Sequence, residues 1–175
     1  MFRHLPVAFG VMVALTGTAG LLRAIGGPPS ATRPALTETD KRFLTRAGQT
    51  GESEIALARL AQSRTSNERV RALAATIEQE CDAAISELKK LARKHDVTLA
   101  PLSVAQRAAF EKLEKLTGDA FDQAFLAQVV KDHTDAVALF SQGAKTEHSE
   151  VKAFAERKLP AFKTHLKTAQ DRQKA

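Results

Sequence analysis

The stretch VRALAATIEQECDAAISELKKL, residues 70–91, decides the fold of this chain. Its apolar side chains recur at steps of three and four residues, which places them on one face of an α-helix. The stripe consists of Val70, Leu73, Ala74, Ile77, Cys81, Ala84, Leu88 and Leu91. Such a seam is typical of a helix that packs against other helices along its whole length. We therefore expect a helix over residues 66–95 that belongs to a bundle.

Three further stretches carry a similar stripe and predict long helices, over residues 38–63, 121–145 and 149–170. A weak internal repeat relates two of the four helices, because VRALA at 70–74 closely matches VKAFA at 151–155. Each copy of the repeat opens the second helix of a hairpin. The sequence therefore predicts two helical hairpins.

The segment between the hairpins, residues 97–118, contains a capping box formed by Ser103 and Gln106. A capping box marks the start of a helix, so we expect a short helix over residues 103–116. Two hairpins joined by one long crossover is the ferritin-like arrangement of helices. The predicted fold is all-α: a ferritin-like four-helix bundle of two helical hairpins, joined by a crossover containing a short helix.

Three residues interrupt the predicted helices. Gly48 and Gly51 lie inside the first helix, where paired glycines indicate close helix packing or a bend. Pro160 lies inside the last helix and removes one backbone hydrogen bond. We expect a kink at Pro160 or a junction between two shorter helices.

The N-terminal segment has the pattern of a targeting signal. Arg3 precedes an apolar run over residues 5–22, and the breaker sequence Gly-Gly-Pro-Pro follows at 26–29. We expect residues 1–26 to be a signal peptide or, if uncleaved, an N-terminal membrane anchor. Residues 27–36 are then a linker, and residues 37–171 form the bundle domain. Both alternatives predict an exported, periplasmic domain, anchored in the inner membrane only if the segment is uncleaved.

Composition excludes several classes of protein. A single cysteine cannot form an internal disulfide, so the core alone must stabilise the domain. The chain has no Trp and no Tyr, and thus no polar-tipped aromatic platform for stacking bases. The net charge of +6 is spread along every helix, and export makes nucleic acid an unexpected partner. Membrane contact is expected only through residues 5–22, if they are uncleaved.

Four residues that can bind a proton or a metal interrupt the apolar stripes: Glu54, Cys81, His133 and His165. If they converge in the interior, one carboxylate, one thiolate and two imidazoles suit a single zinc or copper ion. The other interpretation makes them ordinary parts of the core. Cys81 is then a small apolar side chain, and the histidines cap backbone groups or lie at a stripe edge beside Leu166. The sequence leaves both interpretations open.

No set of residues indicates an enzyme. The di-iron bundles need Glu-x-x-His motifs, and none occurs. Neither a Gly-x-Ser-x-Gly elbow, a phosphate loop nor a dinucleotide fingerprint is present. His4 lies in the targeting segment, and His95 and His148 fall at predicted helix ends, where we expect them to be solvated. We therefore expect a non-enzymatic protein.

Three stretches carry a family resemblance: FLTRAGQTGESEIALARLA at 43–61, FDQAFLAQVVKDHTDAVALF at 121–140 and KAFAERKLPAFKTHL at 152–166. They resemble the bacterial "domain of unknown function 4142" family, whose members are exported ferritin-like proteins often labelled predicted outer membrane proteins. The resemblance implies an exported helical bundle and brings no established activity. Members of that family typically carry an Asp-His pair where this chain has Glu80-Cys81, so a histidine site shared with the family is altered here.

Two functions follow as expectations. The first is a non-enzymatic domain that acts through its surface in the cell envelope or stress response, with an unidentified envelope protein or a second copy as partner. The alternative is a metal-binding or metal-sensing bundle that uses Glu54, Cys81, His133 and His165. An exposed apolar groove favours the first function, and interior convergence of the four side chains favours the second.

Overall fold

The computed structural model describes residues 35–174, in which every regular element is a helix. The five helices are α1 (Glu38–Arg64), α2 (Glu68–Lys94), α3 (Val104–Glu114), α4 (Gly118–Gly143) and α5 (Ser149–Gln173). The all-helical prediction is confirmed. The predicted signal peptide or anchor and most of the predicted linker lie outside the described residues. Within residues 35–174, no helix is both long enough and apolar enough to cross a membrane.

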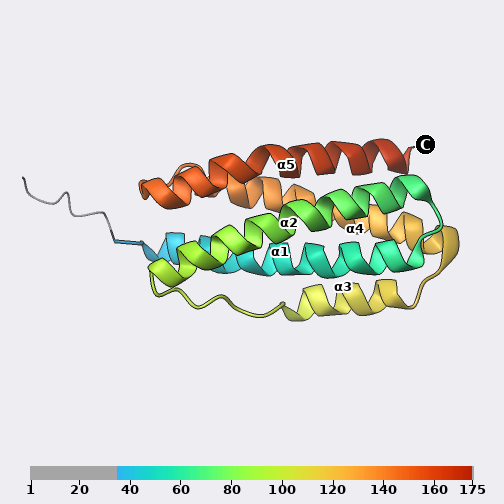
Figure 1. The fold of residues 1–175 in the computed structure, drawn as a ribbon, viewed down its shortest axis with the longest axis horizontal. Helices are drawn as coiled ribbons and strands as arrows, with labels where there is room; N and C mark the ends of the chain where they lie inside the picture. The colour runs from blue at the N-terminus through green and yellow to red at the C-terminus, as the bar shows by residue number, and fades with distance from the viewer. Residues whose placement is uncertain (1–34, 175) are drawn as a thin grey trace, which may run out of the picture. The chain divides into compact units, whose positions relative to one another are not determined.

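The four long helices pack side by side as a bundle (Figure 1). α1 packs on α2, α4 packs on α5, and the two hairpins meet through α1 with α4 and α2 with α5. The connection between the hairpins runs back along the bundle, and its short helix α3 contacts α1 and α4. As a result, α2 and α4 run in the same direction. The ends of α2 and α4 and the starts of α1 and α5 meet at one end of the bundle.

Side-chain caps begin three of the helices. Thr37 and Asp40 form a reciprocal capping box at α1, and Ser103 and Gln106 form another at α3. Asn67 caps α2 through its side-chain oxygen. These bonds satisfy backbone N–H groups that have no partner inside the helix. The Ser103 start signal predicted from the sequence is confirmed.

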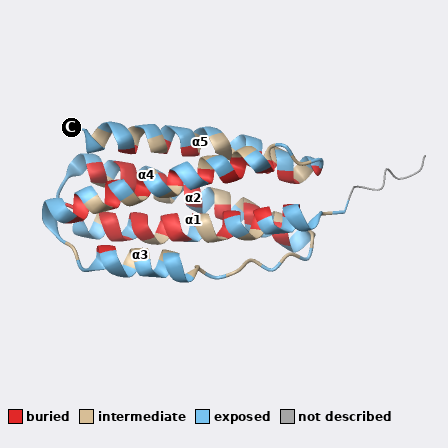
Figure 2. Ribbon diagram, turned by 180° about the vertical axis from the view of Figure 1, so that it is seen from behind, coloured by how far each residue is buried: buried red, intermediate tan, exposed pale blue. Residues whose placement is uncertain are grey.

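Phenylalanine dominates one end of the core. The rings of Phe43, Phe140, Phe154 and Phe162 contact one another with centroid separations between 4.6 and 6.4 Å. Figure 2 shows that buried residues line the inward faces of the long helices, while the outer faces are exposed. Each Phe contributes a large apolar area, and edge-to-face ring pairs add further stabilisation.

The buried stripes differ from the predicted ones in phase. On α2, Ile85 is buried where a strict heptad places Ala84, and on α4, Ala136 is buried rather than Val137. On α5, His165 is 3% exposed, whereas Leu166 is only half-buried. The helix repeats every 3.6 residues, so its buried face drifts away from a 3.5-residue pattern.

Pro160 does not divide the last helix. α5 is continuous from Ser149 to Gln173, so the expectation of two shorter helices was wrong. The proline is exposed. The backbone carbonyl left without its helical partner, that of Glu156, therefore belongs to a residue on the solvated side, where water can replace the lost bond.

Gly51 marks a close approach of α1 and α2. A Cβ atom at this position would lie 2.6 Å from Cδ1 and 2.7 Å from Cγ1 of Ile85. At Gly48, one turn away, a Cβ atom would meet Leu99 and Leu88 at ordinary contact distances of 3.4–3.5 Å. α1 is unbroken over both positions, so Gly51 serves close packing of the hairpin.

The two glycines should therefore respond in opposite ways to alanine. We expect Gly51→Ala to lower the free energy of unfolding by about 1–3 kcal/mol, because it overpacks the contact with Ile85. Gly48→Ala should leave it unchanged or raise it by up to about 1 kcal/mol, the difference in helix propensity. Urea denaturation followed by circular dichroism measures both. Equal effects at the two positions would show that the close contact is not what selects glycine at position 51.

Candidate functional site

Two histidines meet in the interior of the bundle. His133 on α4 is fully buried, and His165 on α5 is 3% exposed. Nε2 of His133 lies 3.2 Å from Nδ1 of His165, and the two rings stand edge to face with centroids 5.2 Å apart. The pairing follows from the hairpin, which turns the two helix faces that carry these residues toward each other.

The second nitrogen of each imidazole has an oxygen partner. Nδ1 of His133 lies 3.1 Å from the carbonyl oxygen of Val129, one turn earlier on α4. Nε2 of His165 lies 3.3 Å from Oε2 of Glu80 on α2. The Val129 carbonyl accepts a hydrogen bond from Nδ1 of His133 and so orients that imidazole. The Glu80 carboxylate lies near Nε2 of His165 without the alignment of a hydrogen bond.

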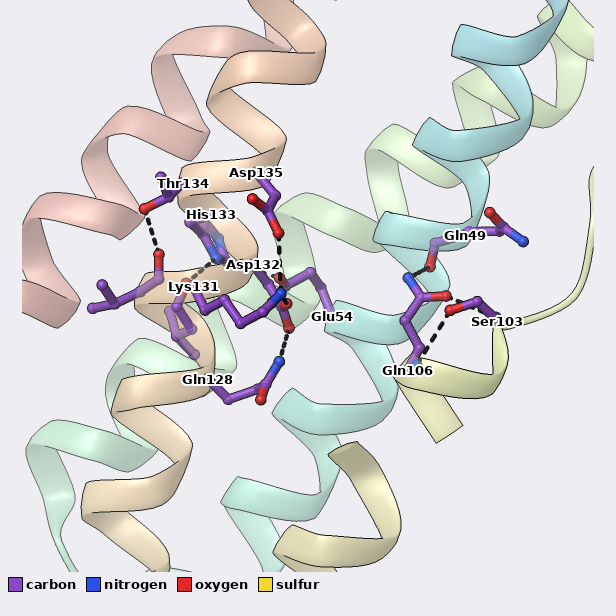
Figure 3. A network of polar contacts seen from close by, with 12 residues as sticks. Gln49, Glu54, Ser103, Gln106, Gln128, Lys131, Asp132, His133, Thr134 and Asp135 are labelled. Carbon is purple, nitrogen blue, oxygen red and sulfur yellow. Dashed lines mark hydrogen bonds and ion pairs between the residues drawn. The ribbon is translucent and has the colours of Figure 1, made fainter. Parts of the chain in front are cut away.

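Glu54 lies on the other side of His133. Its side chain is 1% exposed, and Oε1 lies 3.3 Å from Nδ1 of His133. This close approach is not aligned as a hydrogen bond, because Nδ1 carries one hydrogen and directs it at the Val129 carbonyl. Neither carboxyl oxygen of Glu54 has a hydrogen-bond partner among the described residues. Figure 3 shows Glu54 reaching from α1 toward Asp132 and His133 on α4.

Burial keeps these groups uncharged. It raises the pKa of Glu54 well above its ordinary value, and the charge of Asp132 raises it further. Burial lowers the pKa of His133 to about 3, with His165 adding to the effect. Burial also lowers the pKa of His165, against the opposing influence of Glu80. Burial thus favours the neutral form of both imidazoles and the protonated form of Glu54.

Two neutral imidazoles have enough hydrogens for their two hydrogen bonds. Nδ1 of His133 donates to Val129, so Nε2 of His133 presents a lone pair to His165. A proton on Nδ1 of His165 completes the contact between the rings and leaves Nε2 of His165 with a lone pair on the side of the partly exposed Glu80. A cation between the rings would take the place of that bridging proton.

Cys81 is buried beside the histidine pair. It lines a cavity of about 210 Å³ together with His165, Glu80 and Phe162. Burial raises the pKa of the thiol far above its ordinary range, and the charge of Glu80 raises it further. Such a thiol is protonated and a poor nucleophile at neutral pH.

The four residues selected from the sequence thus meet only in part. Glu54, His133 and His165 form a chain of contacts, and Cys81 lies on the cavity next to its end. Within residues 35–174, no three of the four bring their ligand atoms within 4.8 Å of one another. The interior position predicted for each of them is confirmed by burial of 3% exposure or less.

Sequence reasoning missed two residues of this site. Glu80, on the exposed side of α2, contacts His165, although only its neighbour Cys81 lies on the predicted stripe. Asp132 lines a second cavity, of about 390 Å³, on the side of Glu54. The sequence did contain a signal for Asp132. It directly precedes His133, so it lies next to the buried face of the predicted helix.

The surroundings of His148 also differ from those expected from the sequence. The expectation that His95 and His148 are solvated helix ends was wrong, because His148 is 2% exposed and His95 is half-buried. The two hairpins cover both rings where α2 ends and α5 begins, and no local pattern predicts that contact.

Fold and site together define a class of protein: an all-helical bundle of two hairpins with a pair of buried imidazoles. Comparison with known families gives a match to the "Domain of unknown function (DUF4142)" over residues 26–171. The chain therefore belongs to the DUF4142 family, as its sequence motifs indicate.

One solved structure shares the fold. It is described as the crystal structure of a DUF305 fragment from Deinococcus radiodurans, and it superposes with a TM-score of 0.73 at 18% sequence identity. The match covers 80% of this chain and 98% of that chain. At this identity the similarity concerns the fold alone. No curated protein matches the sequence.

Replacing Glu54 tests whether its carboxyl group is protonated. A raised pKa in the folded state means that the folded chain holds the proton while the unfolded chain releases it, so wild-type stability falls as pH rises above the unfolded value. Glu54→Gln removes this loss. We expect the variant to gain on the wild type as the pH rises above the unfolded value of about 4.5, by up to about 1.4 kcal/mol per pH unit. If chemical denaturation gives the same pH dependence of the unfolding free energy for the wild type and the variant, Glu54 is ionised in the folded protein.

Proposed function

We propose that this protein binds a single zinc or copper ion in the interior of the bundle, between His133 and His165. One observation carries the proposal: two buried, neutral imidazoles face each other across 3.2 Å, and each is held from behind by an oxygen. Neutral imidazole is the form of histidine that binds metals.

The separation of the two nitrogens suits a shared ion. Two imidazole nitrogens bound to one tetrahedral zinc, at about 2.0–2.1 Å each, lie about 3.3 Å apart. An ion there would replace the proton between the rings, while Nδ1 of His133 still donates to Val129 and Nε2 of His165 carries its proton on the side of Glu80. Histidine ligands with a carbonyl or carboxylate behind them are the usual outer-shell arrangement of metal sites.

Cys81 is the third ligand in this proposal. It shares a cavity with His165, and a bound cation would lower the pKa of its thiol and release the thiolate. Two nitrogens and one sulfur suit zinc or copper better than calcium or magnesium. Glu54 faces the Nδ1 side of His133, away from this position, so it supports His133 from behind and is not a direct ligand.

The surface offers less support for a function through binding of a protein partner. Val104, at 76% exposure, is the only large hydrophobic residue that is exposed in the part of the chain described by the structure. A docking groove would need a contiguous apolar patch. The surface-acting function stays a prediction from the sequence, and we favour metal binding.

Metal should raise stability through this site. We expect zinc at about 100 times its dissociation constant to add about 2.7 kcal/mol to the unfolding free energy, which corresponds to roughly 10 °C in melting temperature. His133→Gln and His165→Gln should each remove the interior site's contribution and so lower this gain, and Cys81→Ser should lower it less. Lys163→Gln, an exposed change on the same helix as His165, is the matched control.

Cobalt(II), a spectroscopic substitute for zinc, reports on the ligands directly. Wild-type protein should show thiolate-to-cobalt charge-transfer absorption, and Cys81→Ser should lose that band while it retains d–d absorption from the histidines. A zinc-dependent gain of undiminished size in both histidine variants would contradict the proposal, because the interior site would then contribute nothing to it.

Two further parts of the proposal concern the fold class and the compartment. We assign the bundle to the ferritin-like arrangement on its two hairpins and long crossover, and we propose that the chain is exported through residues 1–26. Fractionation of cells that express the full-length gene should place the protein in the periplasm. Deletion of residues 1–29 should leave it in the cytoplasm with unchanged cooperative melting, and a loss of cooperative melting would mean that this segment belongs to the fold.

A further inference from the structure

A second cluster of potential metal ligands lies at the end of the bundle, away from the interior histidines. His95 caps the C-terminus of α2, His148 occupies the N-cap position of α5, and Glu150 lies in the first turn of α5. One ligand atom from each residue lies within 4.8 Å of the others. Among the described residues, no other group of three His, Cys, Asp or Glu side chains meets that condition.

His148 has the features of a ligand without its ion. The side chain is 2% exposed, and neither ring nitrogen has a hydrogen-bond partner in residues 35–174. It occupies an N-cap position but makes no side-chain cap bond. A buried polar group without a partner is destabilising, by about 1–3 kcal/mol, so its retention needs an explanation. The ring of His95 stands edge to face against it, with centroids 4.9 Å apart.

Glu150 supplies the carboxylate of the cluster. Its Oε2 lies 2.8 Å from Nε2 of His95, while its Oε1 accepts from Lys94. The two oxygens thus have separate partners, and Oε2 faces the histidines. The ammonium of Lys94 on the far oxygen orients the carboxylate, as outer-shell groups do at metal sites.

The cluster is held by well-defined backbone. The N–H of His95 bonds to the carbonyl oxygens of Ala92 and Arg93 at the end of α2. The N–H of His148 donates to Oγ1 of Thr146, and that hydroxyl donates to the buried Asp40 at the start of α1. Three helix ends therefore fix the positions of the two imidazoles.

We propose that His95, His148 and Glu150 bind a divalent transition-metal ion, with zinc as the expected species. Two imidazoles and one carboxylate are a ligand set of zinc sites that keep a fourth position for water. Ligand atoms bound to one zinc lie about 3.2–3.5 Å apart, so the contact between His95 and Glu150, now 2.8 Å, would widen slightly around the ion. Partial exposure of His95 and Glu150, at 15% and 28%, leaves a path for the ion.

The proposal is independent of the interior site. It uses other residues, and it gives the ion a different role, because His95 belongs to the first hairpin while His148 and Glu150 belong to the second. An ion at this position links the two hairpins at one end of the bundle. The bound ion would cross-link two helices whose ligands, His95 and Glu150, are 55 residues apart in the sequence.

Histidine ring resonances in nuclear magnetic resonance spectra distinguish the two sites. We expect stoichiometric zinc to shift the ring signals of His95 and His148 in protein produced from the full-length gene. The same shifts should persist in His165→Gln, where the interior pair is broken. Glu150→Gln should weaken zinc binding at the bundle end by at least roughly tenfold, since even outer-shell changes at zinc sites cost about 10- to 100-fold.

Glu147→Gln is the matched control, because Glu147 is an exposed carboxylate in the same loop. Its zinc affinity should equal that of the wild type. Glu150 is half-buried, so its variant tests the site even if His148→Asn fails to fold. The proposal is overturned if the ring signals of His95 and His148 do not shift when zinc is added. It is also overturned if Glu147→Gln and Glu150→Gln lose the same amount of zinc affinity. Neither result bears on the interior site.

Discussion

A carboxyl group and two imidazoles share the middle of the bundle with phenylalanine and leucine side chains, and none of them can carry a charge there without compensation. Desolvation keeps His133 and His165 neutral and leaves the proton on Glu54. The hydrogen-bond pattern around the pair follows from this neutrality. So does its capacity to take up a cation, because a neutral imidazole has a free lone pair.

The sequence predicts the four long helices well, because stripes and caps are local. Ser103 acts as the sequence suggests, and His133 is buried where its place on the stripe puts it. Phase errors arise where neighbouring positions are both apolar, as at Ala84 and Ile85, since a one-residue difference depends on how far the helix departs from a heptad.

Contacts between the two hairpins cannot be predicted from these local stripes and caps. His95 and Glu150 are 55 residues apart, and nothing in the loop sequences indicates that they meet. Glu80 is a similar case, because its contact with His165 depends on how far the two hairpins are rotated about their axes. The family resemblance likewise points to position 81, whereas the residue that touches His165 is its neighbour at position 80. A single sequence carries the pattern of each helix but not the relative placement of its faces.

The contact between Gly51 and Ile85 also determines the height at which the helices meet. If α2 slid along α1 by one turn, either Cys81 or Lys89 would face the glycine instead of Ile85. The shorter cysteine would leave a void, and the lysine would bring a charge into the core. Sliding is therefore penalised in both directions, and the position of α2 along α1 is fixed. A residue without a side chain thus sets how Glu80 and Cys81, a little over one turn away on α2, are placed relative to α1.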